Sequence, residues 1–149
     1  MTGVGYVILV GALAGVLVAG LTPGTTDPGR RDQKADETVA VNFIVYRNAV
    51  NHVALSEHTA SGTIPLASLK LPAGWKALRG WSNRIESGVC YVYGPGTEFE
   101  AKAVVTMLRS HAVGQNVGGH MFNDAGFGPP LPTWIPAGCI VSTIGIPEG

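Results

Sequence analysis

The sequence predicts an α+β protein. In it an N-terminal transmembrane helix precedes an amphipathic helix and a second helix packed on a small, mainly antiparallel sheet. Three observations support this prediction. A run of eighteen uncharged, mostly apolar residues lies near the N-terminus, heptad-spaced apolar side chains follow it, and short β-branched segments separated by Gly and Pro occupy the C-terminal half. The length of 149 residues suits one ordinary domain with an added anchor and excludes a large multidomain enzyme.

The first of these elements is the run over residues 4–21, VGYVILVGALAGVLVAGL. As a helix it would be about 27 Å long, close to the ~30 Å hydrocarbon core of a bilayer. A cleaved secretory signal would carry a basic n-region, which is absent, and a buried core helix is usually shorter and more polar. Residues 1–21 are therefore predicted to be a single membrane anchor.

Small residues form a stripe along that anchor. Gly11, Gly15 and Ala19 recur every four residues, a pattern that lets a second membrane helix approach closely. The alternative is that glycine is simply common in membrane helices.

The orientation of the anchor is a separate question. Arg30, Arg31 and Lys34 follow it and favour a cytoplasmic C-terminal domain by the positive-inside rule.

Residues 22–35 are predicted to be a Pro/Gly linker, since two Pro-Gly pairs disfavour a continuous helix. The soluble domain then covers residues 36–149. An amphipathic helix is expected from Asp36 to about Ser61. Its seam consists of apolar side chains at spacings of four and three, namely Val39, Phe43, Tyr46, Val50 and Val53. The seam is too short for a free-standing coiled coil, so packing on the domain's own sheet is favoured.

Strands and one further helix are expected in the rest of the chain. Thr97 is a candidate N-cap for a helix reaching Ser110, with Glu100 completing a capping box. Strands are expected at Val89–Tyr93, Val113–Phe122 and Cys139–Ile146, and irregular chain at residues 62–86 and 126–130. This order favours a sheet covered by helices on one side.

Composition and motifs exclude several classes of function. Charged residues make up 13% of the chain, about half the usual ~25%. Residues 36–149 hold seven basic and eight acidic side chains, so no nucleic acid partner is expected. The four histidines form no metal-ligand motif, and no nucleophile elbow or phosphate-binding loop is present. We therefore expect no metal, no cofactor, no catalytic residues and no enzyme activity.

Two features remain as candidate sites. Trp75, Trp81 and Arg79 are candidate partner contacts, because Trp and Arg are enriched at interface hot spots. A membrane-interface belt, or a buried Trp beside solvated charges, would give the same pattern. Cys90 and Cys139 fall in predicted strands, where they could form a disulfide in an oxidising compartment or stay as small buried side chains.

Several segments together carry a family resemblance. They are Tyr46-Arg47-Asn48-Ala49-Val50, Gly62-Thr63, Leu71-Pro72 with Trp75, Tyr91-Val92-Tyr93 before Gly94-Pro95, and Leu131-Pro132 with Ile135-Pro136 and Gly138. In this order, and with the anchor, the chain resembles the PilM family of thin (type IVb) pilus gene clusters, often found on conjugative plasmids. The actin-like cytoplasmic protein of the same name is a different protein.

The resemblance implies a role in pilus assembly at the bacterial inner membrane, with the soluble domain in the periplasm. Its implied partners are other pilus-assembly membrane proteins or pilins, and a homo-oligomer is left open. The order of elements also resembles that of pilins. If Gly5-Tyr6 is compared with the prepilin cleavage site, Val10 stands at the position where a processed pilin has Glu. We therefore expect a scaffold protein that is not cleaved. The alternatives are a minor pilin or pseudopilin in the filament and a membrane-tethered periplasmic hydrolase.

Overall fold

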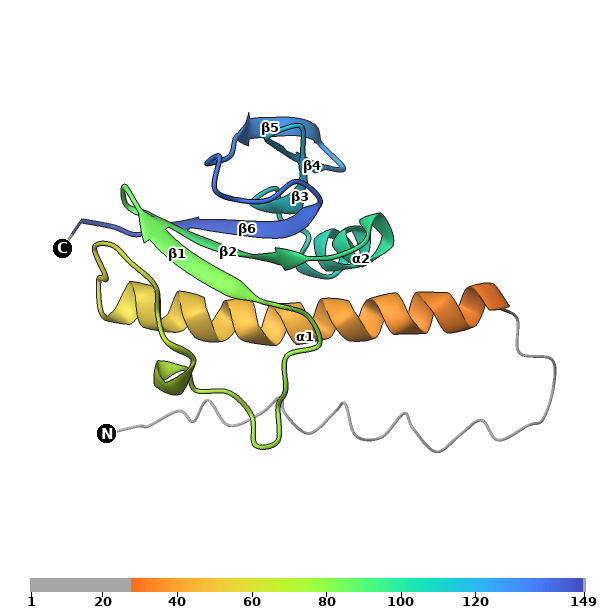
Figure 1. The fold of residues 1–149 in the computed structure, drawn as a ribbon, viewed down its shortest axis with the longest axis horizontal. Helices are drawn as coiled ribbons and strands as arrows, with labels where there is room; N and C mark the ends of the chain where they lie inside the picture. Colours follow the sequence, from red (N-terminus) through yellow and green to blue (C-terminus); the bar gives the residue numbers. More distant parts are fainter. Residues whose placement is uncertain (1–27, 149) are drawn as a thin grey trace, which may run out of the picture.

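The computed structural model describes residues 28–148, which form an antiparallel sheet with two α-helices on one face (Figure 1). The elements are α1 (Pro28–Ser56), the short 3-10 helix η1 (Leu66–Ser68), β1 (Ser82–Glu86), β2 (Val89–Pro95), α2 (Glu98–Leu108), β3 (Val113–Val117), β4 (His120–Asn123), β5 (Gly126–Pro130) and β6 (Cys139–Gly145). The six strands lie in the order β1-β2-β6-β3-β4-β5, and every neighbouring pair is antiparallel. The predicted α+β class is therefore confirmed.

Helix α1 begins earlier than the sequence pattern predicts. It starts at Pro28, so residues 28–35, which were predicted to belong to a linker, are helical. Proline is tolerated at the first helical position because its missing N–H has no intrahelical partner there. After Gly29 no further breaker follows, and the helix runs on to Ser56, short of the expected end near Ser61.

The heptad seam of α1 packs on the domain as predicted. Phe43 and Val50 are fully buried. They belong to a core that also contains Val92 of β2, Val104 of α2 and Ile140 of β6. In Figure 1 the C-terminal part of α1 runs along the sheet, while its N-terminal part projects past the sheet edge beneath α2. Burying each such side chain stabilises the fold by about 1.5–3 kcal/mol.

The opposite face of the sheet is also covered. Cys139 and Val141 of β6 pack there against Leu131 and Ile135 of the segment between β5 and β6. Trp134 of the same segment makes an edge contact with Tyr91 of β2 at a centroid distance of 5.4 Å. The sheet is thus covered by helices on one face and by a connecting segment on the other.

The strand predictions are confirmed for β2 and β6, and the helix prediction for α2 with its capping box. Three expectations were wrong. Residues 82–86 form the edge strand β1 instead of irregular chain. The expected strand over 113–122 is a β3–β4 hairpin, because Gly118 and Gly119 adopt positive φ angles of 61° and 83° that a tight turn requires. Residues 126–130 form the edge strand β5, where prolines are tolerated.

Within residues 28–148, no helix is long and apolar enough to cross a bilayer. The anchor predicted over residues 1–21 lies outside the described residues, and so do Gly11, Gly15 and Ala19.

Candidate functional site

A groove separates the projecting part of α1 from α2, and we call it the α1–α2 groove. Its volume is about 860 Å³. The groove has an acidic wall on α1, formed by Asp32, Asp36 and Glu37, and an apolar wall on α2, formed by Phe99, Ala103 and Met107. The two walls differ in chemistry, so a molecule that fits between them must be both charged and apolar.

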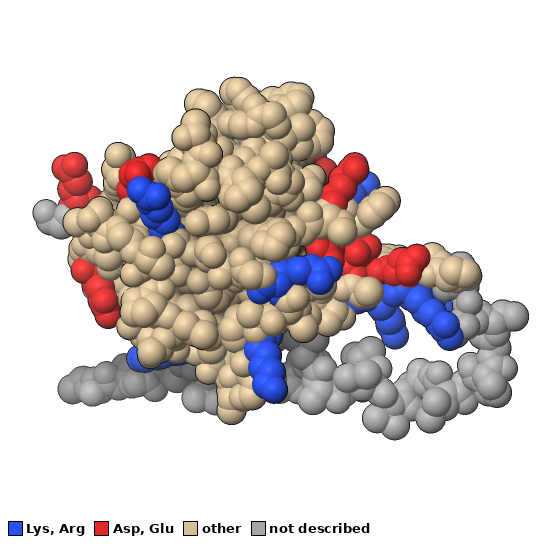
Figure 2. Space-filling model, in the orientation of Figure 1, with Lys and Arg blue, Asp and Glu red and all other residues tan. Residues whose placement is uncertain are grey.

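The acidic wall continues the seam that packs α1 on the domain. Asp32 lies four residues before Asp36, which lies three residues before Val39. The same alternation of four and three continues to Phe43. The stripe that is apolar over the core therefore becomes acidic where α1 projects past it. Figure 2 shows acidic side chains along the upper edge of this projecting end and basic ones along its lower edge. This wall is not among the sites predicted from the sequence, although acidic residues at seam positions are a signal that could have revealed it.

The apolar wall exposes side chains that are usually buried. Phe99 is 69% exposed and Met107 is 42% exposed. They stand eight residues apart with Ala103 between them, so all three lie along one side of α2. Two turns of helix therefore present an uncovered apolar stripe toward the groove.

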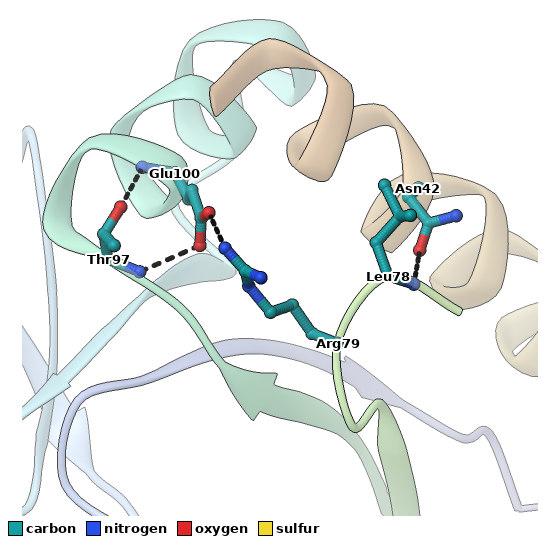
Figure 3. Close-up of polar contacts among 5 residues, drawn as sticks. All are labelled: Asn42, Leu78, Arg79, Thr97 and Glu100. Carbon is teal, nitrogen blue, oxygen red and sulfur yellow. Dashed lines mark hydrogen bonds and ion pairs between the residues drawn. The ribbon is translucent and has the colours of Figure 1, made fainter. Parts of the chain in front are cut away.

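An ion pair fixes the N-terminal end of α2 beside this groove (Figure 3). Glu100, whose side chain is only 4% exposed, binds Arg79 from the segment before β1. The second carboxylate oxygen of Glu100 accepts a hydrogen bond from the Thr97 N–H at 2.9 Å, and the Thr97 Oγ1 accepts one from the Glu100 N–H at 3.1 Å. The capping box and the ion pair thus share one carboxylate.

Asn42 of α1 holds the same segment from the other side (Figure 3). Its Oδ1 accepts hydrogen bonds from the Leu78 N–H at 2.9 Å and from the Trp81 Nε1–H at 2.7 Å. Its Nδ2 donates to the Lys76 carbonyl oxygen at 2.8 Å. Residues 76–81 are therefore tied to both helices at the edge of the groove.

The candidate contact residues from the sequence occupy different environments. Trp81 is only 9% exposed and packs edge-on against Phe43, so its ring belongs to the core and offers no free face to a partner. Trp75 is half-buried and stacks on Tyr46 at a centroid distance of 6.0 Å. Arg79 is the one of the three that lines the α1–α2 groove, where it is already paired with Glu100.

The two cysteines are free thiols on opposite faces of the sheet. Cys90 aligns with Ile144 of β6, and Cys139 lies five positions earlier on that same strand. An odd separation along a strand places side chains on opposite faces, and five residues span about 16 Å. A disulfide requires Cα atoms within about 7 Å, so the bridge considered from the sequence does not form in this fold.

Several polar side chains elsewhere in the domain form contacts within it. The Arg47 Nε donates to the Ser142 Oγ at 2.6 Å across the helix–sheet interface, and burial lowers the pKa of Arg47. The ring nitrogens of His58 and His120 lie 3.4 Å from the backbone carbonyl oxygens of Pro147 and Gly128. Within residues 28–148, no cluster of His, Cys, Asp and Glu side chains could hold a metal ion.

A family model described as PilM matches residues 10–143 of the chain. The fold is similar to the crystal structure of a PilM protein from Escherichia coli B7A, with a TM-score of 0.58 and 21% sequence identity, covering 83% of this chain and 100% of that chain. At that identity the likeness shows a common fold. No curated protein matches the chain significantly.

Proposed function

The chain belongs to the PilM family, and from this membership we propose that it is a non-enzymatic component of type IV (thin) pilus biogenesis. In this proposal it sits in the bacterial inner membrane and docks other assembly subunits through its periplasmic domain. The observation that carries the proposal is the family match over residues 10–143, which includes part of the apolar run as well as nearly all of the described domain.

The surface of the domain supports a docking role. The α1–α2 groove exposes apolar side chains beside unpaired carboxylates, and such surfaces usually serve contacts with other molecules. The other polar clusters described above are engaged in packing. Docking of assembly proteins or pilins is therefore a better match to this surface than turnover of a small substrate.

Gene deletion with complementation tests the role. Loss of the chain should abolish or strongly reduce surface pili, and the full-length chain should restore them. Pili are counted by electron microscopy, and the amounts of the other assembly proteins are measured in the membrane fraction. Normal piliation in the deletion strain would contradict the proposed role.

A reporter fused after Gly149 tests the membrane orientation. Arg30, Arg31 and Lys34 favour a cytoplasmic domain by the positive-inside rule, whereas assembly at the periplasmic face requires the opposite. We expect alkaline phosphatase activity from the fusion and no fluorescence from a reporter that folds only in the cytoplasm. The reverse pattern would contradict the periplasmic placement.

A minor pilin or pseudopilin is the second candidate. Helix α1 is 29 residues long, and its N-terminal part projects past the sheet, an arrangement suited to packing in a filament. The mass of the mature N-terminus separates the two candidates. Cleavage after Gly5 would favour the filament subunit, and an intact N-terminus favours the scaffold.

A further inference from the structure

We propose that the α1–α2 groove binds a basic amphipathic helix of a partner protein. This inference rests on the proposed docking function and adds the chemistry of the partner. It is carried by the charge of one wall, the apolar stripe of the other wall and the composition of the rest of the chain.

The acidic wall lacks cationic partners within the described residues. Asp32, Asp36 and Glu37 form no ion pair there, and Glu37 accepts only a hydrogen bond from the Gln33 amide. Arg79, which also lines the groove, is paired with Glu100. The groove lining thus holds three acidic side chains without an ion pair and one unpaired cation, Lys102. A concave surface with this excess of negative charge attracts Lys and Arg side chains.

The apolar wall sets the shape of the partner. Phe99 and Met107 are separated by about 12 Å along α2, the length of two helical turns. A helix laid along this stripe would contact it through side chains at spacings of three and four, as amphipathic helices do in apolar grooves. Its polar edge would then face Asp32 and Asp36. The same helix must therefore carry Lys or Arg beside its apolar face.

Neither the segment over residues 1–27 nor the projecting end of α1 supplies such a helix. Residues 1–27 contain no Lys, Arg or His, so this segment brings no cationic side chain to the acidic wall. A second copy could offer Arg30, Arg31 and Lys34, but residues 28–38 include no large apolar side chain to fill the apolar wall. Charge and hydrophobicity together point to a different protein as the occupant.

Photo-crosslinking in piliated cells tests the proposal with the full-length chain. A photoreactive phenylalanine analogue replaces Phe99, and the crosslinked peptide is sequenced by mass spectrometry. Phe127 on β5, which is 67% exposed and outside the groove, provides the matched control position. We expect an adduct at Phe99, absent at Phe127, to a partner segment with Lys or Arg beside apolar residues at helical spacing.

The acidic wall should determine the yield of that adduct. Removing the exposed charge of Asp32 and the half-buried charge of Asp36 with Asp32→Asn and Asp36→Asn should lower the yield about three- to tenfold. Glu57→Gln with Glu148→Gln removes the same charge outside the groove and should leave the yield unchanged. Circular dichroism of each variant establishes that the fold is retained.

Several results would overturn the proposal. They are no adduct at Phe99, an adduct to a second copy or to residues 1–27, an adduct to a segment without basic residues, and a yield that does not depend on Asp32 and Asp36. These results are distinguishable from failure of the proposed function. An adduct to a non-basic segment of a pilus protein would refute only the proposed chemistry of the groove. An adduct to a basic helix of a protein unrelated to pili would refute only the proposed role in pilus biogenesis.

Discussion

Glu100 is the residue on which the edge of the groove depends most directly. Its carboxylate caps α2 through Thr97 and binds Arg79 while almost fully buried. Truncation in Glu100→Ala removes both interactions and leaves the Thr97 N–H without its partner. We expect the free energy of unfolding to fall by about 2–3 kcal/mol, measured by urea denaturation.

Glu98 provides the matched control for this change, because it stands in the same first turn of α2 and is exposed. Its interaction with the helix dipole is worth about 0.3–1 kcal/mol, so Glu98→Ala should cost less than 1 kcal/mol. Equal losses in the two variants would show that the buried ion pair and the capping box contribute nothing beyond the dipole.

Cys90 predicts a pH dependence of stability. Burial raises the pKa of its thiol from 9.0 to about 11, although Arg47 acts in the opposite direction. Between these values the unfolded chain loses the proton first, so the stabilisation present below pH 9 is lost as pH rises toward 11. The loss should be about 1–3 kcal/mol.

Urea denaturation at pH 8, 9 and 10.5 measures this effect. Cys90→Ala should show a flatter decline, with a residual slope because burial also raises the pKa values of Tyr46 and Tyr91. The same slope in wild type and variant would contradict the assignment to Cys90. Thiol titration in urea without reductant should find two free cysteines, as the separation of Cys90 and Cys139 requires.

At the residue scale, the sequence predicts those contacts that join residues close together in the chain. Thr97 and Glu100 stand three residues apart, and that spacing alone predicts the capping box. The placement of Trp81 could not be predicted, because its burial depends on Asn42 and Phe43, which lie almost forty residues earlier on α1. The sequence pattern predicts Arg79 to be an interface residue, but its ion-pair partner Glu100 comes from another element and is not predictable from that pattern.

At the scale of elements, β3 and β4 are held at close approach by a glycine. A Cβ atom on Gly114 would lie 2.4 Å from the carbonyl oxygen of Phe122. That oxygen belongs to the backbone of β4, so Gly114→Ala must shift the hairpin and should cost about 1–3 kcal/mol. The midpoint of urea denaturation measures this cost.

Gly145→Ala on β6 is the corresponding control, because nothing lies within 4 Å of its added Cβ atom. It should change stability by less than about 0.5 kcal/mol. A Gly114→Ala variant as stable as Gly145→Ala would contradict the close packing of β3 against β4.

The sequence correctly predicts the elements whose own residues show a clear pattern of apolar, β-branched or aromatic side chains. The β-branched and aromatic residues of β2, and the apolar seam of α1, identify their structures without help from the rest of the chain. Strand β5 contains two glycines and two prolines and is a strand only because β4 offers it a partner. The position of β6 between β2 and β3 is likewise a property of the assembled sheet, which no local pattern encodes.

At the scale of the whole molecule, charged side chains are distributed unevenly. Asp124 is the only Asp, Glu, Lys or Arg between residues 110 and 147, and Figure 2 shows the β3–β5 end of the domain as almost uniformly uncharged. The acidic wall of the groove lies on the projecting end of α1, which follows residues 1–27 in the chain. Partners that recognise charge are therefore expected at the end of the domain nearest the proposed membrane anchor.

The anchor itself is tested by the small residues that the sequence places on one face. If residues 4–21 form a membrane helix that packs through Gly11 and Gly15, then Gly11→Leu with Gly15→Leu separates it from its neighbour. We expect co-purification with other pilus-assembly membrane proteins and the number of pili to fall together. Leu13→Phe with Leu17→Phe adds bulk on the opposite face of such a helix and should leave both unchanged. Equal behaviour of the two double variants, with normal membrane insertion of each, would show that the glycine face makes no helix–helix contact.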